Sequence, residues 1–164
     1  MGVRTWLREH FVTADAIYGL ILYSALVGGV SDDDSNALEV LLISAVSLVI
    51  FWGAHVFAGT IANHGMKDGA EVRLGSAFRG AVAHSSGMLW AAILPSVALL
   101  LGVVRLVSTD DAVSLAMLIA TLQLGVLGYQ AFAQRRSGIP VRILGGLGTA
   151  LFGFFMILLN IAVH

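Results

Sequence analysis

The second long apolar stretch of the chain, residues 36–63, most limits what this sequence can fold into. It exceeds the roughly 20 residues that an α-helix needs to cross a bilayer. One histidine, His55, lies inside it, between Phe51 and Gly59. A polar, titratable side chain in hydrocarbon is unfavourable unless it faces a partner. We therefore expect a membrane-spanning helix whose histidine has a partner or a function.

The composition places the whole chain in the membrane class. Of its 164 residues 58% are hydrophobic and 12% charged, and the mean hydropathy is +0.91. Soluble domains are about half apolar and a quarter charged. The 19 glycines with only 2 prolines suit membrane helices that pack closely. We expect the lipid bilayer to be the chain's main partner.

Several classes of function find no support in the sequence. The absence of cysteine removes disulfides and thiolate metal sites. A net charge of -1 argues against nucleic-acid binding, which needs a basic face. There is no HExxH, GxSxG or phosphate-binding glycine loop. We predict that the protein is not an enzyme and needs no cofactor.

The apolar runs predict an all-α bundle of five transmembrane helices in a single domain, residues 1–164. The expected spans are residues 10–30, 37–62, 80–104, 112–133 and 141–163. We expect Met1 to His10 to lie at the membrane interface, and Ser31 to Asp34 to form a solvated turn. The connection from 63 to 79 reads as polar.

The distribution of charge predicts the orientation. Eight of the nine basic residues fall at the N-terminus and around the connections after the second and fourth spans: Arg4, Arg8, Lys67, Arg73, Arg79, Arg135, Arg136 and Arg142. The opposite connections hold only Arg105 among several acids. By the positive-inside rule we expect a multi-pass protein of the inner or plasma membrane with its N-terminus in the cytoplasm and its C-terminus outside.

Asp15 and His55 form the candidate site, because both lie about 8 Å on the cytoplasmic side of their helix centres at 1.5 Å per residue. With Tyr18 and, somewhat lower, His84, they could line an ion or proton pathway open to the cytoplasm. Asp15 and His55 are also the candidate ligands if a metal binds. The alternative is that these groups only bond neighbouring helices. Pro95 is a candidate hinge in the third span.

Small residues at intervals of four predict faces for close helix crossing. One set is Gly145, Thr149 and Gly153, and the other is Ala54, Ala58 and Ala62. Each face could meet a helix of the same chain or of another chain. A homo-oligomer or a partner membrane protein is therefore expected.

Motifs carry three resemblances. Ile17-Tyr18-Gly19, the stretch from Phe51 to Ala58 and Gly128-Tyr129 resemble a group of five-helix integral membrane proteins of actinobacteria without an assigned activity. Ala14-Asp15-Ala16 with residues 25–29 is similar to the first helix of the vacuolar iron transporter family, dimeric exchangers of divalent cations for protons. That resemblance implies that Asp15 lines a metal path. Residues 14–18 and 51–55 also look like the first two helices of endolysosomal-type potassium channels.

The sequence thus leaves two classes of function open. The leading hypothesis is small-cation or proton-coupled transport, with Asp15 as acceptor and His55 as its titrating partner. The rival is an accessory or scaffold subunit that does not transport and presents its small-residue faces to a larger membrane complex.

Overall fold

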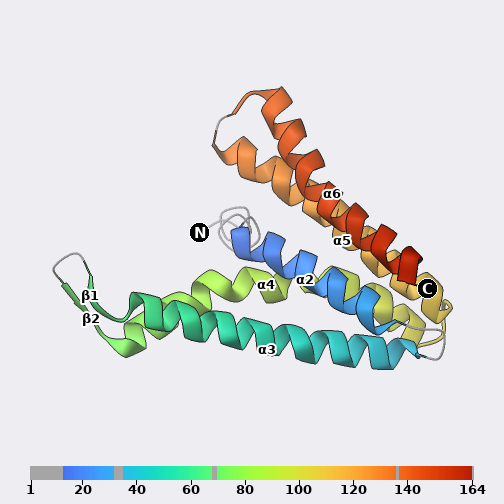
Figure 1. Cartoon of the computed structure of the whole chain (residues 1–164), viewed down its shortest axis with the longest axis horizontal. Helices are drawn as coiled ribbons and strands as arrows, with labels where there is room; N and C mark the ends of the chain where they lie inside the picture. The colour runs from blue at the N-terminus through green and yellow to red at the C-terminus, as the bar shows by residue number, and fades with distance from the viewer. Residues whose placement is uncertain (1–12, 32–34, 68–69, 136, 164) are drawn as a thin grey trace.

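A computed structural model describes residues 13–31, 35–67, 70–135 and 137–163 of the chain. Within these ranges five α-helices account for nearly all of the structure (Figure 1), as the sequence predicts. The helices are α2 (Ala14–Val30), α3 (Ala37–Asn63), α4 (Leu74–Val103), α5 (Thr109–Gln134) and α6 (Ile139–Val163). The predicted interfacial segment from Met1 to His10 and the acidic residues 32–34 lie outside the described residues.

Two predicted boundaries change between α3 and α4. The polar connection predicted after the second span contains an antiparallel hairpin of β1 (Gly65–Lys67) and β2 (Ala70–Val72), which the sequence did not predict. Gly65 starts it at φ +98, a conformation that glycine adopts without strain. Helix α4 then begins at Leu74, six residues before the predicted start at Gly80. Hydropathy did not predict these first six residues of α4, because hydropathy indicates contact with lipid and the helix continues beyond the hydrocarbon.

The helices have the dimensions of an integral membrane protein. α3, α4, α5 and α6 are each long and apolar enough to cross a bilayer. α2, with 17 residues, is the short one and at 1.5 Å per residue it measures about 25 Å. Most large apolar side chains of α3 and α6 face outward, where a bilayer would cover them.

The short helix α2 occupies the middle of the bundle, in contact with all four other helices. Its buried face includes Tyr23 and Val27, which belong to one core cluster with Met88 and Leu99 of α4. Leu20 belongs to a second cluster, with Ala91 of α4 and Leu124 of α5. At the far end of α2, the Asn160 amide of α6 donates to the Gly28 carbonyl oxygen at 3.0 Å. A residue on the inner face of α2 is therefore surrounded by protein.

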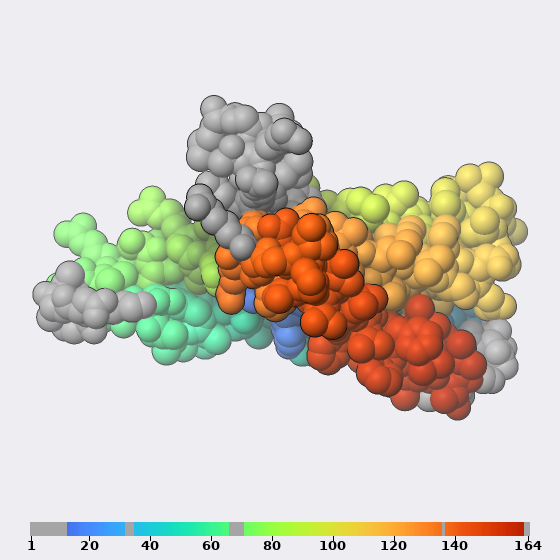
Figure 2. All heavy atoms as spheres, turned by 90° about the horizontal axis from the view of Figure 1, so that it is seen from above, coloured from blue at the N-terminus to red at the C-terminus, as the bar shows by residue number. Residues whose placement is uncertain are grey.

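α5 and α6 form a hairpin that lies beside the other helices at one end and diverges from them toward the other (Figure 1). Seen from above, the ends of α3 and α4 next to the β-hairpin project beyond the turn between α5 and α6 (Figure 2). Close contact within this pair depends on glycine, since a Cβ at Gly128 would lie 2.5 Å from the Gly145 carbonyl oxygen. Thr149 adds an interhelical hydrogen bond to the Leu124 carbonyl oxygen, 2.7 Å long.

Candidate functional site

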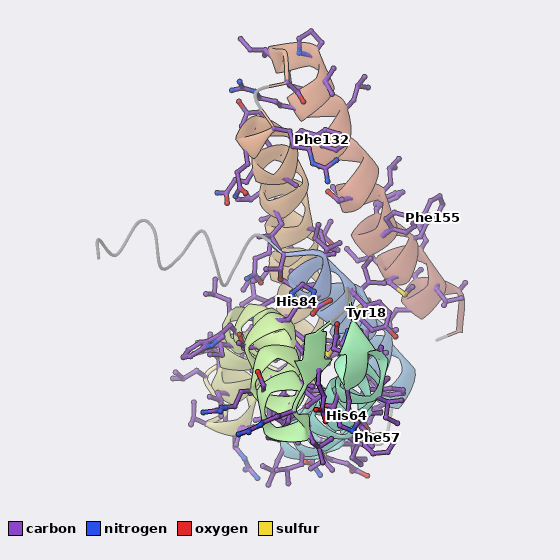
Figure 3. The ribbon with its side chains drawn as sticks, turned by 90° about the vertical axis from the view of Figure 1, so that its left-hand side faces the viewer. Tyr18, Phe57, His64, His84, Phe132 and Phe155 are labelled. Atoms are coloured by element: carbon purple, nitrogen blue, oxygen red, sulfur yellow. The ribbon has the colours of Figure 1, made fainter. Side chains whose placement is uncertain are left out.

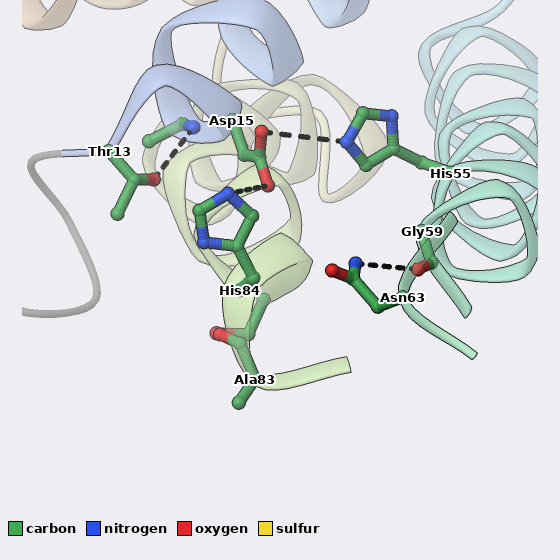
Figure 4. Close-up of polar contacts among 9 residues, drawn as sticks. Thr13, Asp15, His55, Gly59, Asn63, Ala83 and His84 are labelled. Carbon is green, nitrogen blue, oxygen red and sulfur yellow. Dashed lines mark hydrogen bonds and ion pairs between the residues drawn. The ribbon is translucent and has the colours of Figure 1, made fainter. Parts of the chain in front are cut away.

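The carboxylate of Asp15 lies between two histidines that come from two other helices (Figure 4). Its Oδ1 is 3.5 Å from His55 Nε2 on α3, and its Oδ2 is 3.8 Å from His84 Nε2 on α4. Both separations are those of ion pairs and exceed the usual length of a direct hydrogen bond. The structure thus joins three of the four residues of the predicted pathway, and brings His84 level with Asp15, because α4 starts earlier than predicted.

Tyr18, the fourth predicted residue, belongs to the same cluster. It follows Asp15 by one turn of α2, and its ring stacks on the His55 imidazole with centroids 6.2 Å apart and planes at 29°. The stacking fixes the orientation of the imidazole on one side, and Asp15 engages its Nε2 on the other. His64 lies elsewhere, with its Nδ1 3.0 Å from the Val72 carbonyl oxygen in the β-hairpin.

Asp15 lies at the N-terminal end of α2, the positive end of the helix dipole. Thr13 caps the helix, its hydroxyl accepting a hydrogen bond of 3.1 Å from the Ala16 amide. Asp15 therefore lies in the first turn, where the partial positive charge of the helix N-terminus stabilises a carboxylate. Among the described residues no group donates a hydrogen bond to its Oδ2. The helix terminus and the two imidazoles are the groups that offset its burial.

Gly19 sets the separation between α2 and α4 next to the site. A Cβ at Gly19 would lie 2.7 Å from Met88 Cα, closer than real side chains approach. Gly19 follows Asp15 by four residues and Met88 follows His84 by four, so this contact lies one turn from the Asp15–His84 pair. Gly19 thus positions the two partners, a role that the sequence analysis missed. The spacing was visible in the sequence, since residues four apart on a helix share a face and Gly19 is four residues after Asp15.

The three side chains differ in their exposure. The Asp15 side chain is 10% exposed, whereas those of His55 and His84 are 43% and 75% exposed. Tyr18 and His84 lie on the side of the α2–α4 group that faces α5 and α6, whereas Phe57 and His64 lie on its far side (Figure 3). A buried carboxylate therefore lies next to two imidazoles that are themselves partly exposed.

Pro95 is buried within α4. The carbonyl group that it leaves without a donor in its own helix accepts a hydrogen bond from another helix. Proline has no N–H for the carbonyl four residues earlier. The Gln123 amide of α5 donates to that Ala91 carbonyl oxygen at 3.3 Å. One residue later, the Ser96 hydroxyl donates to Ala92 and shares a 2.7 Å hydrogen bond with the hydroxyl of Tyr23. The predicted hinge position is thus tied to both α2 and α5.

The two predicted small-residue faces lie in different surroundings. Gly145, Thr149 and Gly153 face α5, where a Cβ at Gly153 would come within 2.8 Å of Thr121 Cα. Ala54 and Ala58 are exposed on the outside of α3. The first face therefore serves packing within the chain, whereas the second is left uncovered by the helices that the structure describes.

The geometry of the cluster bears on the predicted metal ligands. Within the described part of the chain no group of three or more His, Asp or Glu side chains is placed to hold a metal ion. Asp15 and His55 remain as a pair, fewer protein ligands than zinc sites use.

Comparison with protein-family models finds no match, and neither curated proteins nor solved structures give a significant one. The function is therefore inferred from the chemistry of the Asp15 cluster.

Proposed function

We propose that this integral membrane protein carries protons, alone or coupled to a small cation, through the cluster of Asp15, His55 and His84. The observation that carries the proposal is the buried carboxylate within ion-pair distance of two imidazoles from two different helices. Acidic and histidine side chains facing one another inside a membrane protein are typical of proton relays. In this proposal Asp15 is the acceptor, and the histidines exchange protons with it.

The charge states of the cluster support a proton carrier. With Asp15 ionised and both imidazoles neutral the cluster carries one negative charge, and one proton brings it to neutrality. A neutral cluster is the state most compatible with apolar surroundings. A small cation attracted to the unprotonated cluster would compete with that proton, and such competition is the basis of coupled exchange.

The orientation belongs to the proposal as well. Positive residues concentrated at the N-terminus, the β-hairpin end and the α5–α6 turn favour the cytoplasm for that side. Asp15, His55 and His84 would then open toward the cytoplasm of an inner or plasma membrane. Protons would need a second path from the cluster to the outer side, and movement about Pro95 is the candidate for opening it.

Proton flux into proteoliposomes that hold a pH-sensitive dye tests the proposal. We expect the native chain to carry protons under an imposed pH gradient and the Asp15→Asn variant to fall to the rate of empty liposomes. His55→Gln should slow the flux, since it removes one exchange partner. Asp110→Asn, which removes a carboxylate exposed at the start of α5, is the matched control and should leave the flux unchanged. Equal flux in the native and Asp15→Asn proteins would refute the assignment.

A second candidate function is that of an accessory subunit, as a monomer or a homo-oligomer, in a larger membrane complex. The outward-facing Ala54 and Ala58 support it. Small residues on an exposed helix face allow another membrane helix to approach closely. The folded native protein would then show no flux across a panel of ions and both directions of the pH gradient. Co-purification with a larger membrane complex, lost in an Ala58→Leu variant, would favour this function.

A further inference from the structure

An apolar groove lies on the outer surface near the β-hairpin, away from the Asp15 cluster. It has a volume of about 610 Å³ and is open along one side. Side chains of the last turns of α3 and of the first turn of α4 line it, chiefly Trp52, Gly53 and Phe57 from α3 and Leu74, Gly75 and Phe78 from α4.

The walls of the groove suit hydrocarbon. A Cβ at Gly53 or at Gly75 would meet nothing within 4 Å, so the space at both positions is open. The Thr60 hydroxyl, which also lines the groove, already donates to the Val56 carbonyl oxygen at 2.7 Å. A polar ligand would lose its hydration here without gaining hydrogen bonds. The groove therefore fits an acyl chain.

A basic residue lies beside the groove at the depth of lipid headgroups. Arg79 is exposed, and its Nε donates to the carbonyl oxygen of Gly75, a lining residue, at 3.2 Å. At 1.5 Å per residue Arg79 lies about 14 Å from the midpoint of α4, close to half the roughly 30 Å of bilayer hydrocarbon. None of the ion pairs among the described residues involves Arg79, and its two Nη groups are suited to bidentate phosphate binding.

We infer that the groove binds one acyl chain of an anionic phospholipid from the surrounding bilayer, with Arg79 binding its headgroup phosphate. The apolar groove accounts for the chain, and the charge beside its α4 wall accounts for the preference for an anionic lipid. A transmembrane helix of another protein would fill the groove without using the positive charge at headgroup depth. The inference does not depend on what the Asp15 cluster transports.

Native mass spectrometry of the purified full chain in detergent tests the inference. The probes are phosphatidylglycerol and phosphatidylcholine with identical acyl chains, added in equal amounts. We expect the native protein to retain phosphatidylglycerol about fivefold over phosphatidylcholine, the preference that one arginine near anionic headgroups provides. Arg79→Gln should lower this ratio to about one. Arg135→Gln, which removes an equal charge at the end of α5, should leave the ratio unchanged.

Filling the groove separates chain binding from charge. Gly53→Leu places a side chain in open space, so the variant should fold and lose retention of both lipids. Gly75→Leu fills the groove from the other wall. It is the variant to use if circular dichroism shows that Gly53→Leu does not fold. An unchanged ratio in Arg79→Gln, or unchanged retention in the groove-filling variant, would overturn the inference. So would a dimer that dissociates in that variant, since a second copy would then occupy the groove.

Discussion

The hydrogen bond between Gln123 and the Ala91 carbonyl group gives a sharp test of how this bundle accommodates a buried proline. Pro95 cannot supply the N–H that Ala91 needs, and the Gln123 amide supplies a donor from α5 at 3.3 Å. Gln123→Met keeps a long, unbranched side chain and removes the amide. We expect this variant to be less stable than the native protein because the Ala91 carbonyl oxygen is then unpaired in an apolar environment.

The expected loss follows from the geometry of the bond. Interhelical hydrogen bonds in membrane proteins average about 0.6 kcal/mol and reach about 1.7 kcal/mol. The 3.3 Å length lies at the weak end of the range, but the usual donor for this carbonyl oxygen, the N–H of residue 95, is missing. We therefore expect Gln123→Met to lower the free energy of unfolding by about 1 kcal/mol.

A double-mutant cycle isolates the contribution of the proline. In the Pro95→Ala variant the new N–H at position 95 donates to Ala91, so adding Gln123→Met should lower stability by much less. The measurement is reversible unfolding in mixed micelles of mild and denaturing detergent. Leu122→Met, on the outward side of the same helix, is the control and should change little. An equal effect of Gln123→Met with and without Pro95 would refute the reasoning.

The same unfolding assay tests two further contacts. Gly128→Ala should lower stability by about 2 kcal/mol because its Cβ meets the α6 backbone, whereas Gly148→Ala, with nothing within 4 Å, should change little; equal effects would show that α5 and α6 do not pack as described. Tyr23→Phe keeps the buried ring but loses the 2.7 Å hydrogen bond to Ser96, so stability should fall by about 0.6 kcal/mol. A Tyr23→Phe variant as stable as the native protein would contradict that contribution.

Membrane thickness made most of the fold predictable from the sequence. A bilayer requires apolar runs of a fixed minimum length, so the five helices and the order of their connections could be read directly. The start of α4 could not, because Arg79 looks like a loop residue, although it lies on a helix that leaves the hydrocarbon. That error of six residues also placed His84 too low.

The depth of the site residues in the membrane was predictable from the sequence, but the rotation of their helices was not. Counting residues placed Asp15 and His55 at the same level, whereas their contact depends on how α2 and α3 are turned about their axes, which a single sequence does not specify. The small-residue faces show the same limit. Ala54 and Ala58 have the spacing of Gly145 and Thr149. Among the helices that the structure describes, Gly145 and Thr149 pack against α5, whereas Ala54 and Ala58 are exposed. The spacing of small residues identifies a helix face that can pack closely, but it does not identify the helix that packs there.

The three members of the Asp15 cluster belong to three helices, and this has a mechanical consequence. Asp15 of α2 faces His84 of α4 and His55 of α3, so a single carboxylate links one helix to two others. The close approach of Gly19 to Met88 holds α2 and α4 together independently of that carboxylate. Loss of the Asp15 carboxylate would therefore weaken the hold on α3 more than the hold on α4.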